Sequence, residues 1–550
     1  MDAASIRPYL LKCGYRPTLI RSHVAFGDGQ TVSLVAFAYP PADARSACIA
    51  VLDGCEDAHK AVLACQGVGT PIVFSCGLDS LDWWSQDTAG PRPIRKIAAR
   101  DVPQFFHKHA AEFRPERVYR AKTWARFDKE FQLSFVDRGL MPLIEGQFGQ
   151  ALQDLIERNV AALKSNLRWH DIDHEQGHWL LQTVFGLISA KILRDKEVPA
   201  FEGLELTDVD EVFVRLARHH NVAPVLILEG RRRAAVAEIA QEIRRFSCLG
   251  LATAESLAYV YENALISKEL RAELGIHSTP PYLVDYTVGK LARWIEAMAV
   301  EERNVFEPAC GHAGFLVAAM RLLTELLPPE RATAANRRNY LRKRVHGCEI
   351  DPFALEIARL SLTLADVPNP DGWDLVLGDM FSDDLLERQS CKATILLANP
   401  PFENFSRKEL EAYREADVAI SYLNKTAEML SRTLPQLPAG AVFGVVGPES
   451  LLHNKNSQGL REILLRDFEI SEICCFPDKV FTFSDVESTV ILGRRRMSPD
   501  QGRSITSFRR VRERHMERFK SDYECTVRSD VDQSRFGTLR GLDLRAPELG

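Results

Sequence analysis

The spacing of apolar and polar residues changes three times along the chain and divides it into four sections. Residues 1–148 carry short apolar runs such as TVSLVAFAYP, which predict a small N-terminal α/β accessory domain. Residues 149–265 repeat apolar residues at every third or fourth position, which predicts a helical domain. Residues 266–495 alternate such helices with short apolar strands, which predicts a mainly parallel sheet with helices on both faces. Residues 496–550 are basic and weakly patterned, and they can be the start of a longer region.

Length and composition describe an ordinary globular chain. With 550 residues it is too long for one core, so we expect about three or four domains. No apolar run reaches the roughly 18 residues that a membrane helix needs, and the N-terminal MDAASIRPYLLK lacks the layout of a signal peptide. The twelve cysteines include no CxxC pair, so neither a disulfide framework nor a zinc knuckle is indicated. These features predict a cytoplasmic protein with no membrane partner and no bound metal.

The net charge of −6 argues against binding of nucleic acid through the whole surface, so such contacts need local basic patches. Residues 331–344 carry six basic residues and no acid, and residues 494–520 carry ten basic residues against three acids. Either patch can also be an ordinary solvated face. The second patch contains the candidates for contacts with DNA phosphates, Arg494, Arg495, Arg496, Arg509 and Arg510.

Small and polar residues follow the predicted strands of the third section at the points where the strands end. The first strand ends at Glu307, and a loop of small residues with Gly311 and Gly314 leads into a helix. The next two strands end at Glu349 and Asp379. Because ligands of open α/β sheets bind outside the carboxyl ends of the strands, we expect a binding site here. A carboxylate such as Glu349 can accept hydrogen bonds from both hydroxyls of a ribose.

The fourth strand end carries the motif Asn-Pro-Pro-Phe at residues 399–402. An exocyclic amine on adenine is a poor nucleophile because its lone pair is delocalised into the ring. The side-chain oxygen of Asn399 and the carbonyl of Pro400 can accept its two N–H bonds and favour a tetrahedral amine. Pro400 and Pro401 lack N–H donors, and Phe402 offers a face on which an extruded base can stack. The alternative is a plain turn.

With these motifs, residues 258–495 resemble the S-adenosylmethionine-dependent adenine-N6 DNA methyltransferases. The resemblance extends in particular to the methylation subunits of type I restriction–modification systems and to the methylase part of fused restriction enzymes. It implies a Rossmann-like methyltransferase domain with a seven-stranded sheet, S-adenosylmethionine as the cofactor and double-stranded DNA as the substrate. It also implies a role in restriction–modification or a related phage-defence system, with a separate specificity subunit as a partner.

The resemblance also assigns roles to single residues. FEPACGHAGFL matches the first motif of the family, and the stretch that ends in Thr279-Pro280 matches the segment beside the cofactor. The implied cofactor contacts are Thr279, Glu307, Ala309, Gly311, Gly314, Glu349 and Asp379. Phe402 and Phe481 take the positions of aromatic residues that stack on the target base.

Three positions depart from the family pattern. Ser278 replaces an aromatic residue, His312 replaces a serine or threonine, and Ala313 replaces a glycine. An alanine at position 313 costs little if its φ is negative, whereas a required positive φ would weaken cofactor binding.

Other functions stay open at this point. The Asn-Pro-Pro-aromatic motif also serves enzymes that methylate glutamine in proteins or bases in RNA, and a non-catalytic DNA-binding component of a defence complex is a further alternative. The sequence HEQGH at residues 174–178 formally matches a zinc hydrolase motif, although Gly177 weakens a helix there. The strands of residues 1–148 resemble the nuclease domains of fused restriction enzymes. No acid-x-lysine triplet lies on those strands, which favours a degenerate nuclease-like fold over a working nuclease.

Overall fold

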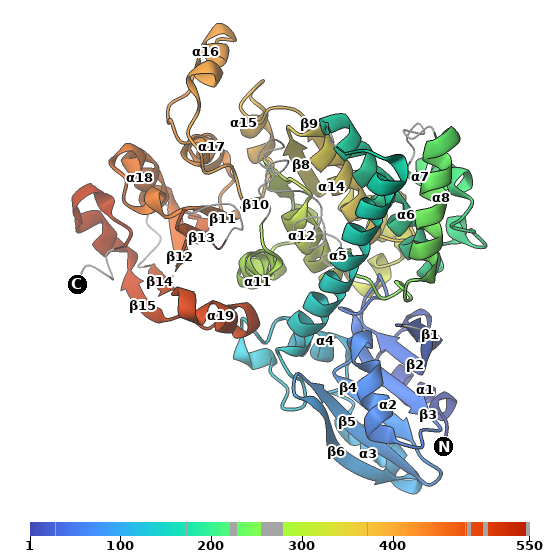
Figure 1. The fold of residues 1–550 in the computed structure, drawn as a ribbon. Helices are drawn as coiled ribbons and strands as arrows, with labels where there is room; N and C mark the ends of the chain where they lie inside the picture. Colours follow the sequence, from blue (N-terminus) through green and yellow to red (C-terminus); the bar gives the residue numbers. More distant parts are fainter. Residues whose placement is uncertain are drawn as a thin grey trace. The chain divides into compact units, whose positions relative to one another are not determined.

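The computed structural model describes residues 1–27, 29–170, 173–220, 228–254, 279–370, 372–478, 480, 486–498 and 504–545. The chain forms two compact units (Figure 1). The first comprises Met1–Leu270 together with Thr363–Gly372, and the second comprises Arg271–Leu362 together with Trp373–Gly550.

The N-terminal part of the first unit is a six-stranded sheet in the order β1-β2-β3-β4-β5-β6. Only the pair β3–β4 is parallel. Both faces are covered, because successive residues of β3 belong to different cores: Ile49 and Val51 to one, and Ala50 and Leu52 to the other. The strands are β1 Ile20–Phe26, β2 Gln30–Phe37, β3 Ala47–Asp53, β4 Ile72–Cys76, β5 Ser80–Asp87 and β6 Gly90–Ala98, and the helices are α1 Ala3–Lys12, α2 Ala58–Ala64, α3 Val102–His109 and α4 Pro115–Thr123.

A helical part follows in the same unit, and Figure 1 shows its long helix α5 beside α6 and α8. The amphipathic spacing that predicted these helices buries one side of α5 and leaves the other in solvent. Helix α6 begins at His174 with Asp173 as its N-cap, in a capping box with Gln176. The helices are α5 Leu140–Leu167, α6 His174–Asp195, α7 Val209–His220 and α8 Gly230–Arg245.

The second unit contains a nine-stranded sheet in the order β15-β14-β12-β13-β11-β10-β7-β8-β9. The strands β9, β8, β7, β10 and β11 run parallel, and β13 is antiparallel to both of its neighbours. The strands are β7 Val305–Glu307, β8 Val345–Glu349, β9 Asp374–Leu377, β10 Ile395–Ala398, β11 Val442–Pro448, β12 Phe468–Phe476, β13 Ser488–Arg495, β14 Ile505–Arg510 and β15 Val527–Asp532.

The seven predicted strands correspond to β7–β13, whereas the whole sheet has nine strands. Strands β14 and β15 come from the basic segment 496–550 and extend the sheet to nine strands. They escaped prediction because their sequences, ITSFRR and VRSDVD, contain many polar residues and no apolar run.

Helices cover both faces of this sheet, as predicted. Helices α11 and α12 pack on one face, and α15, α17 and α18 share a core with the other. The close approach of α11 to β11 requires a glycine, because a Cβ atom at Gly444 would lie 2.5 Å from Cγ2 of Thr287. The helices are α11 Pro281–Ala297, α12 Gly314–Glu325, α13 Ala334–Leu341, α14 Pro352–Ala365, α15 Leu385–Ser390, α16 Arg407–Glu415, α17 Lys425–Thr433, α18 Gln458–Asp467 and α19 Met516–Asp522.

A buried lysine joins α4 to the loop before β3 in the N-terminal sheet. The side chain of Lys122 is only 1% exposed, and its Nζ donates to the carbonyls of Ala44, Arg45 and Ala47 at 2.7, 3.0 and 2.7 Å. Burial lowers the pKa of Lys122 to about 8. The lysine therefore supplies all three of its donors to backbone groups that have left water.

We expect Lys122→Met to destabilise this sheet by about 3 kcal/mol or more, because each buried carbonyl left without a donor costs roughly 1–3 kcal/mol. Urea denaturation followed by circular dichroism measures the effect. The control is Lys129→Met, which removes the charge of an exposed lysine in the same region. Equal unfolding midpoints for the two variants would contradict the role assigned to Lys122.

Candidate active site at the carboxyl ends of the parallel strands

Four polar residues predicted from the sequence lie at one edge of the nine-stranded sheet. Glu307 ends β7, Glu349 ends β8, and Asp379 and Asn399 follow β9 and β10. The strands are parallel neighbours in the order β10-β7-β8-β9, so their carboxyl ends meet at the same edge. This is the edge where open α/β sheets bind ligands.

Glu307 is a buried carboxylate whose hydrogen bonds are incomplete. Its side chain is 3% exposed, and among the described residues Oε2 has no hydrogen-bond partner. Burial raises the pKa of Glu307 well above its usual range, and the charge of Glu349 adds to the increase. A hydrogen bond from the backbone of Leu316, in the first turn of α12, acts in the opposite direction. The unpaired oxygen is suited to a buried cationic or donor group of a ligand.

Backbone amides hold the second carboxylate. Oε2 of Glu349 accepts from the N–H of Gly311 at 2.7 Å, and Oε1 accepts from the N–H groups of Ile350 and Asp351 at 2.9 and 3.0 Å. Burial raises the pKa of Glu349, and these amide donors partly offset the increase. Gly311 reaches Glu349 in a left-handed conformation with φ of 52°.

The small-residue loop before α12 contains a second left-handed residue. Ala313 is fully buried and has φ of 69°. This positive φ is unfavourable for an alanine at a position where the family pattern has glycine. A left-handed conformation costs an alanine about 1–2 kcal/mol. His312 is also buried, Ala309 packs partly buried against the core, and Gly314 is the first residue of α12. Ser278 and Phe481 lie outside the described residues.

The turn after β9 orients Asp379. Its Oδ1 accepts from the N–H of Phe381 at 3.0 Å. Its Oδ2 accepts from the hydroxyls of Ser382 at 3.2 Å and of Tyr413 at 2.7 Å. Tyr413 lies on α16 and packs against Phe405, so the insert after β10 reaches back to the acid.

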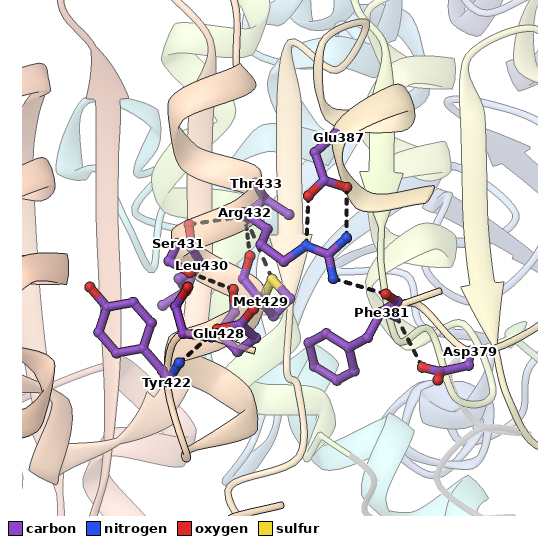
Figure 2. Close-up of polar contacts among 11 residues, drawn as sticks. Asp379, Phe381, Glu387, Tyr422, Glu428, Met429, Leu430, Ser431, Arg432 and Thr433 are labelled. Carbon is purple, nitrogen blue, oxygen red and sulfur yellow. Dashed lines mark hydrogen bonds and ion pairs between the residues drawn. The ribbon is translucent and has the colours of Figure 1, made fainter. Parts of the chain in front are cut away.

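Helix α17 fixes this turn from outside, as Figure 2 shows. The guanidinium of Arg432 forms a two-pronged ion pair with Glu387, at 2.6 and 3.0 Å. Its third nitrogen donates to the carbonyl of Phe381 at 2.9 Å. The residue Phe381 is therefore held at both ends, by Asp379 at its N–H and by Arg432 at its carbonyl.

The Asn-Pro-Pro-Phe motif forms the turn after β10. Nδ2 of Asn399 donates to Oγ1 of Thr279 at 2.8 Å, whereas its Oδ1 is buried and, among the described residues, has no partner. The carbonyl of Pro401 accepts from the hydroxyl of Thr426 at 2.8 Å. The carbonyl of Phe402 accepts from Nδ2 of Asn424, the N-cap of α17, at 2.7 Å.

The structure thus leaves two acceptors at the catalytic turn. No hydrogen bond to the carbonyl of Pro400 is seen among the described residues, in contrast to the carbonyls of Pro401 and Phe402. The second acceptor is Oδ1 of Asn399. The phenyl ring of Phe402 is half-buried. Two acceptors beside an accessible aromatic ring match what a planar amine on a base requires.

Sequence reasoning missed several residues of the site. Arg432, Thr426 and Tyr413 act through contacts that only the fold creates, and their sequence neighbourhoods give no signal. Ile350 could have been recognised from the sequence as a site residue, because it is an apolar residue directly after Glu349 at the end of β8. Its side chain is 66% exposed beside Glu349, where an apolar surface can lie against a planar ligand.

The five arginines predicted to contact DNA have acceptors within the second unit. Three of them pair with carboxylates at 2.8–3.1 Å, and two donate to neutral oxygens at 2.7 and 3.1 Å. The pairs are Arg494 with Glu469, Arg509 with Glu472, Arg510 with Glu449, Arg495 with the carbonyl of Pro435, and Arg496 with the hydroxyl of Ser504. Their contact with phosphates stays a prediction.

Two further observations concern metal ligands and membrane-spanning helices. In the parts of the chain that the structure describes, no three His, Cys, Asp or Glu side chains gather closely enough to hold a metal ion. The side chains of His174 and His178 lie outside that description. Among the described helices, none is both long enough and apolar enough to cross a membrane.

The strand order and the antiparallel β13 give the second unit a Rossmann-like methyltransferase fold, with polar groups at neighbouring strand ends. Residues 254–507 match the family model described as N-6 DNA Methylase, so this part of the chain is similar to that family. The family uses S-adenosylmethionine in general. Among curated protein sequences the chain has no match.

Solved structures of restriction–modification enzymes are similar to the chain at low identity. A modification subunit assigned to a type I restriction enzyme of Vibrio vulnificus YJ016 is 15% identical over 70% of this chain and 93% of its own, with a TM-score of 0.47. The type IIG restriction endonuclease BpuSI is 12% identical over 98% of this chain and 62% of its own, with a TM-score of 0.44. A type I methyltransferase subunit from Streptococcus thermophilus is 16% identical over 78% and 97%, with a TM-score of 0.43. At such values these likenesses carry no weight for the function.

We expect Arg432→Lys to loosen the turn that holds Asp379, because a lysine keeps the charge but lacks the planar fork of donors that pairs with both oxygens of Glu387 while it bonds the Phe381 carbonyl. Hydrogen exchange of peptides that contain Phe381 should become faster, and the stability should fall by about 1–3 kcal/mol. Arg414→Lys, on the exposed surface of α16, is the control. Unchanged exchange in the Arg432 variant would show that the arginine does not hold the turn.

We expect Glu307→Gln to stabilise the ligand-free protein at neutral pH. A carboxyl group with a raised pKa contributes stability that is present below about pH 4.5 and is lost as the pH rises through its folded pKa. The variant and the wild type should therefore be similar near pH 5, and the variant should be more stable than the wild type at pH 8. Urea denaturation at both pH values measures this, with Glu415→Gln on the exposed surface as the control. A variant less stable than wild type at pH 8 would refute the role given to burial.

Proposed function

We propose that the chain transfers a methyl group from S-adenosylmethionine to the N6 amine of adenine in DNA, as part of a restriction–modification or related phage-defence system. The observation that carries the proposal is the buried Oδ1 of Asn399, which has no hydrogen-bond partner among the described residues, beside the Pro400 carbonyl at the end of β10. Two acceptors at one strand end suit an amine with two N–H bonds. The N-6 DNA methylase match of residues 254–507 supports the same chemistry.

The residues at the neighbouring strand ends fit S-adenosylmethionine. Oε2 of Glu307 is a buried carboxylate oxygen that has no partner in the described part of the chain, so it could accept from an ammonium group of the cofactor. Glu349 would hold the ribose hydroxyls, and Asp379 would accept from the exocyclic amine of the cofactor adenine. The exposed side chain of Ile350 lies beside Glu349 and would cover the adenine ring. Thr279, Ala309, Gly311 and Gly314 are proposed to complete this site.

In the proposed mechanism the chain prepares the amine and needs no strong base. The cofactor would supply a methyl group activated by a sulfonium, whose sulfur leaves as a neutral thioether, and the methylated amine would release one N–H proton to water. Asn399 and Pro400 accept the two N–H bonds, which draws the lone pair of the amine out of the ring. Pro401 stiffens the turn, since its φ is restricted. Phe402 stacks on the extruded base, and Phe481 is proposed as a second stacking surface.

The proposed partners are double-stranded DNA and a separate specificity subunit, and the proposed location is the cytoplasm. Sequence recognition in trans is proposed because residues 258–495 resemble methylation subunits that act with a separate specificity subunit. Co-purification of a second protein that restores sequence-specific methylation would test this part.

We expect Asn399→Ala to leave cofactor binding intact and to lower the rate of methyl transfer by about 100–1000-fold, the usual effect of losing one preorganised group in a dry site. The assay is single-turnover transfer of labelled methyl to genomic DNA from a strain without the gene, together with any specificity subunit. Calorimetry measures cofactor binding. Asn404→Ala, an exposed asparagine of the same loop, is the control. A wild-type rate of methyl transfer by Asn399→Ala would show that the Asn-Pro-Pro-Phe motif is only a turn.

A further inference from the structure

Two similar tetrads, far apart in the sequence, meet at the candidate active site. Thr279-Pro280-Pro281-Tyr282 leads into α11, and Asn399-Pro400-Pro401-Phe402 follows β10. They are joined by one hydrogen bond, from Nδ2 of Asn399 to Oγ1 of Thr279, across 120 residues. Each partner of this bond precedes two prolines.

The carboxamide of asparagine has nearly the same shape when it is turned by 180°, but the turn exchanges a donor for an acceptor. Only the acceptor end can receive an N–H of a target amine. The bond to Thr279 engages Nδ2 and leaves Oδ1 buried without a partner among the described residues. A turned amide would place Nδ2 in the position of Oδ1 and would oppose the N–H bonds of the amine.

We propose that Thr279 is a positioning residue that holds Nδ2 of the Asn399 amide, so that Oδ1 faces the substrate. This role rests on the proposed methyltransferase function and is additional to any contact of Thr279 with the cofactor. The threonine acts as an acceptor towards Asn399, so that Asn399 becomes an acceptor towards the substrate.

The threonine is held firmly enough for this role. Its side chain is 7% exposed, and the following Pro280 has φ of −53° and ψ of 137° as the N-cap of α11. Residues before proline are restricted to extended conformations, which applies to Thr279 and to Asn399 alike. Helix α11 itself is fixed on the sheet by the close contact of Thr287 with Gly444 and by the hydrogen bond of the Tyr286 hydroxyl to Glu472.

Thr279→Val and Thr279→Ser test the proposal. Valine has the shape of threonine without the acceptor, whereas serine keeps the hydroxyl. With saturating cofactor and DNA, we expect valine to lower the single-turnover transfer rate by about 10-fold and serine to restore it. Thr287→Val is the matched control, since it removes another buried threonine hydroxyl from α11.

A double variant separates orientation from other roles. If Thr279 acts through Asn399, then Thr279→Val combined with Asn399→Ala should be no slower than Asn399→Ala alone. Effects that multiply, a Thr279→Val rate equal to wild type, or a slow Thr279→Ser would each overturn the proposal.

A wild-type protein that transfers no methyl to DNA would refute the proposed function instead. The orientation is then read directly from crystal structures of the wild type and Thr279→Val. Hydrogen-bond partners of the Asn399 amide show which end faces the site. The same orientation in both proteins, fixed without the threonine hydroxyl, would overturn the positioning role independently of activity.

Discussion

The candidate site depends on holding three carboxylates at neighbouring ends of parallel strands, where the charge of Glu349 opposes ionisation of Glu307. Backbone amides compensate Glu349, and the turn of Asp379 supplies an amide and two hydroxyl groups. Within the described part of the chain, one buried oxygen of Glu307 has no hydrogen-bond partner. The raised pKa of Glu307 shows that burial disfavours its ionised form in the ligand-free protein. A binding group of opposite charge would remove this cost, so the local instability favours occupation of the site.

Helix α17 supports both halves of the site. Its N-cap Asn424 and its Thr426 hold the carbonyls of the catalytic turn, and Arg432, two turns further along, holds the turn of Asp379. The side chain of Glu428 is buried between them and accepts from the N–H groups of Ser421 and Tyr422 (Figure 2). One short helix therefore sets the relative positions of the proposed cofactor and substrate acceptors. A displacement of α17 would disturb both turns together.

The sequence predicted those features of the site that depend on local order. Strand ends were recognisable from apolar runs that stop at Glu307, Glu349 and Asn399, and parallel pairing then brings them to one edge. Contacts across long separations were not predictable, as with Thr279 and Asn399, because no local pattern encodes them. The sign of φ at Ala313 was also hidden, since alanine is compatible with either a helix start or a strained turn. Strands β14 and β15 were missed for a related reason, because pairing rather than hydrophobicity defines them.

The basic segment shows why a count of arginines differs from the charge that is available to DNA. Arg509 and Arg510 are 12% and 16% exposed, and their partners Glu472 and Glu449 are 6% and 5% exposed. Removing one partner of such a buried pair typically costs about 3–5 kcal/mol, because a charge is left uncompensated. A DNA phosphate that binds one of these arginines would have to replace its carboxylate partner, and that carboxylate would stay buried without a counter-charge. These two arginines are therefore better suited to fixing β14 on the sheet, and phosphate contacts are expected from exposed residues of the same segment, Arg512, Arg514 and Arg518.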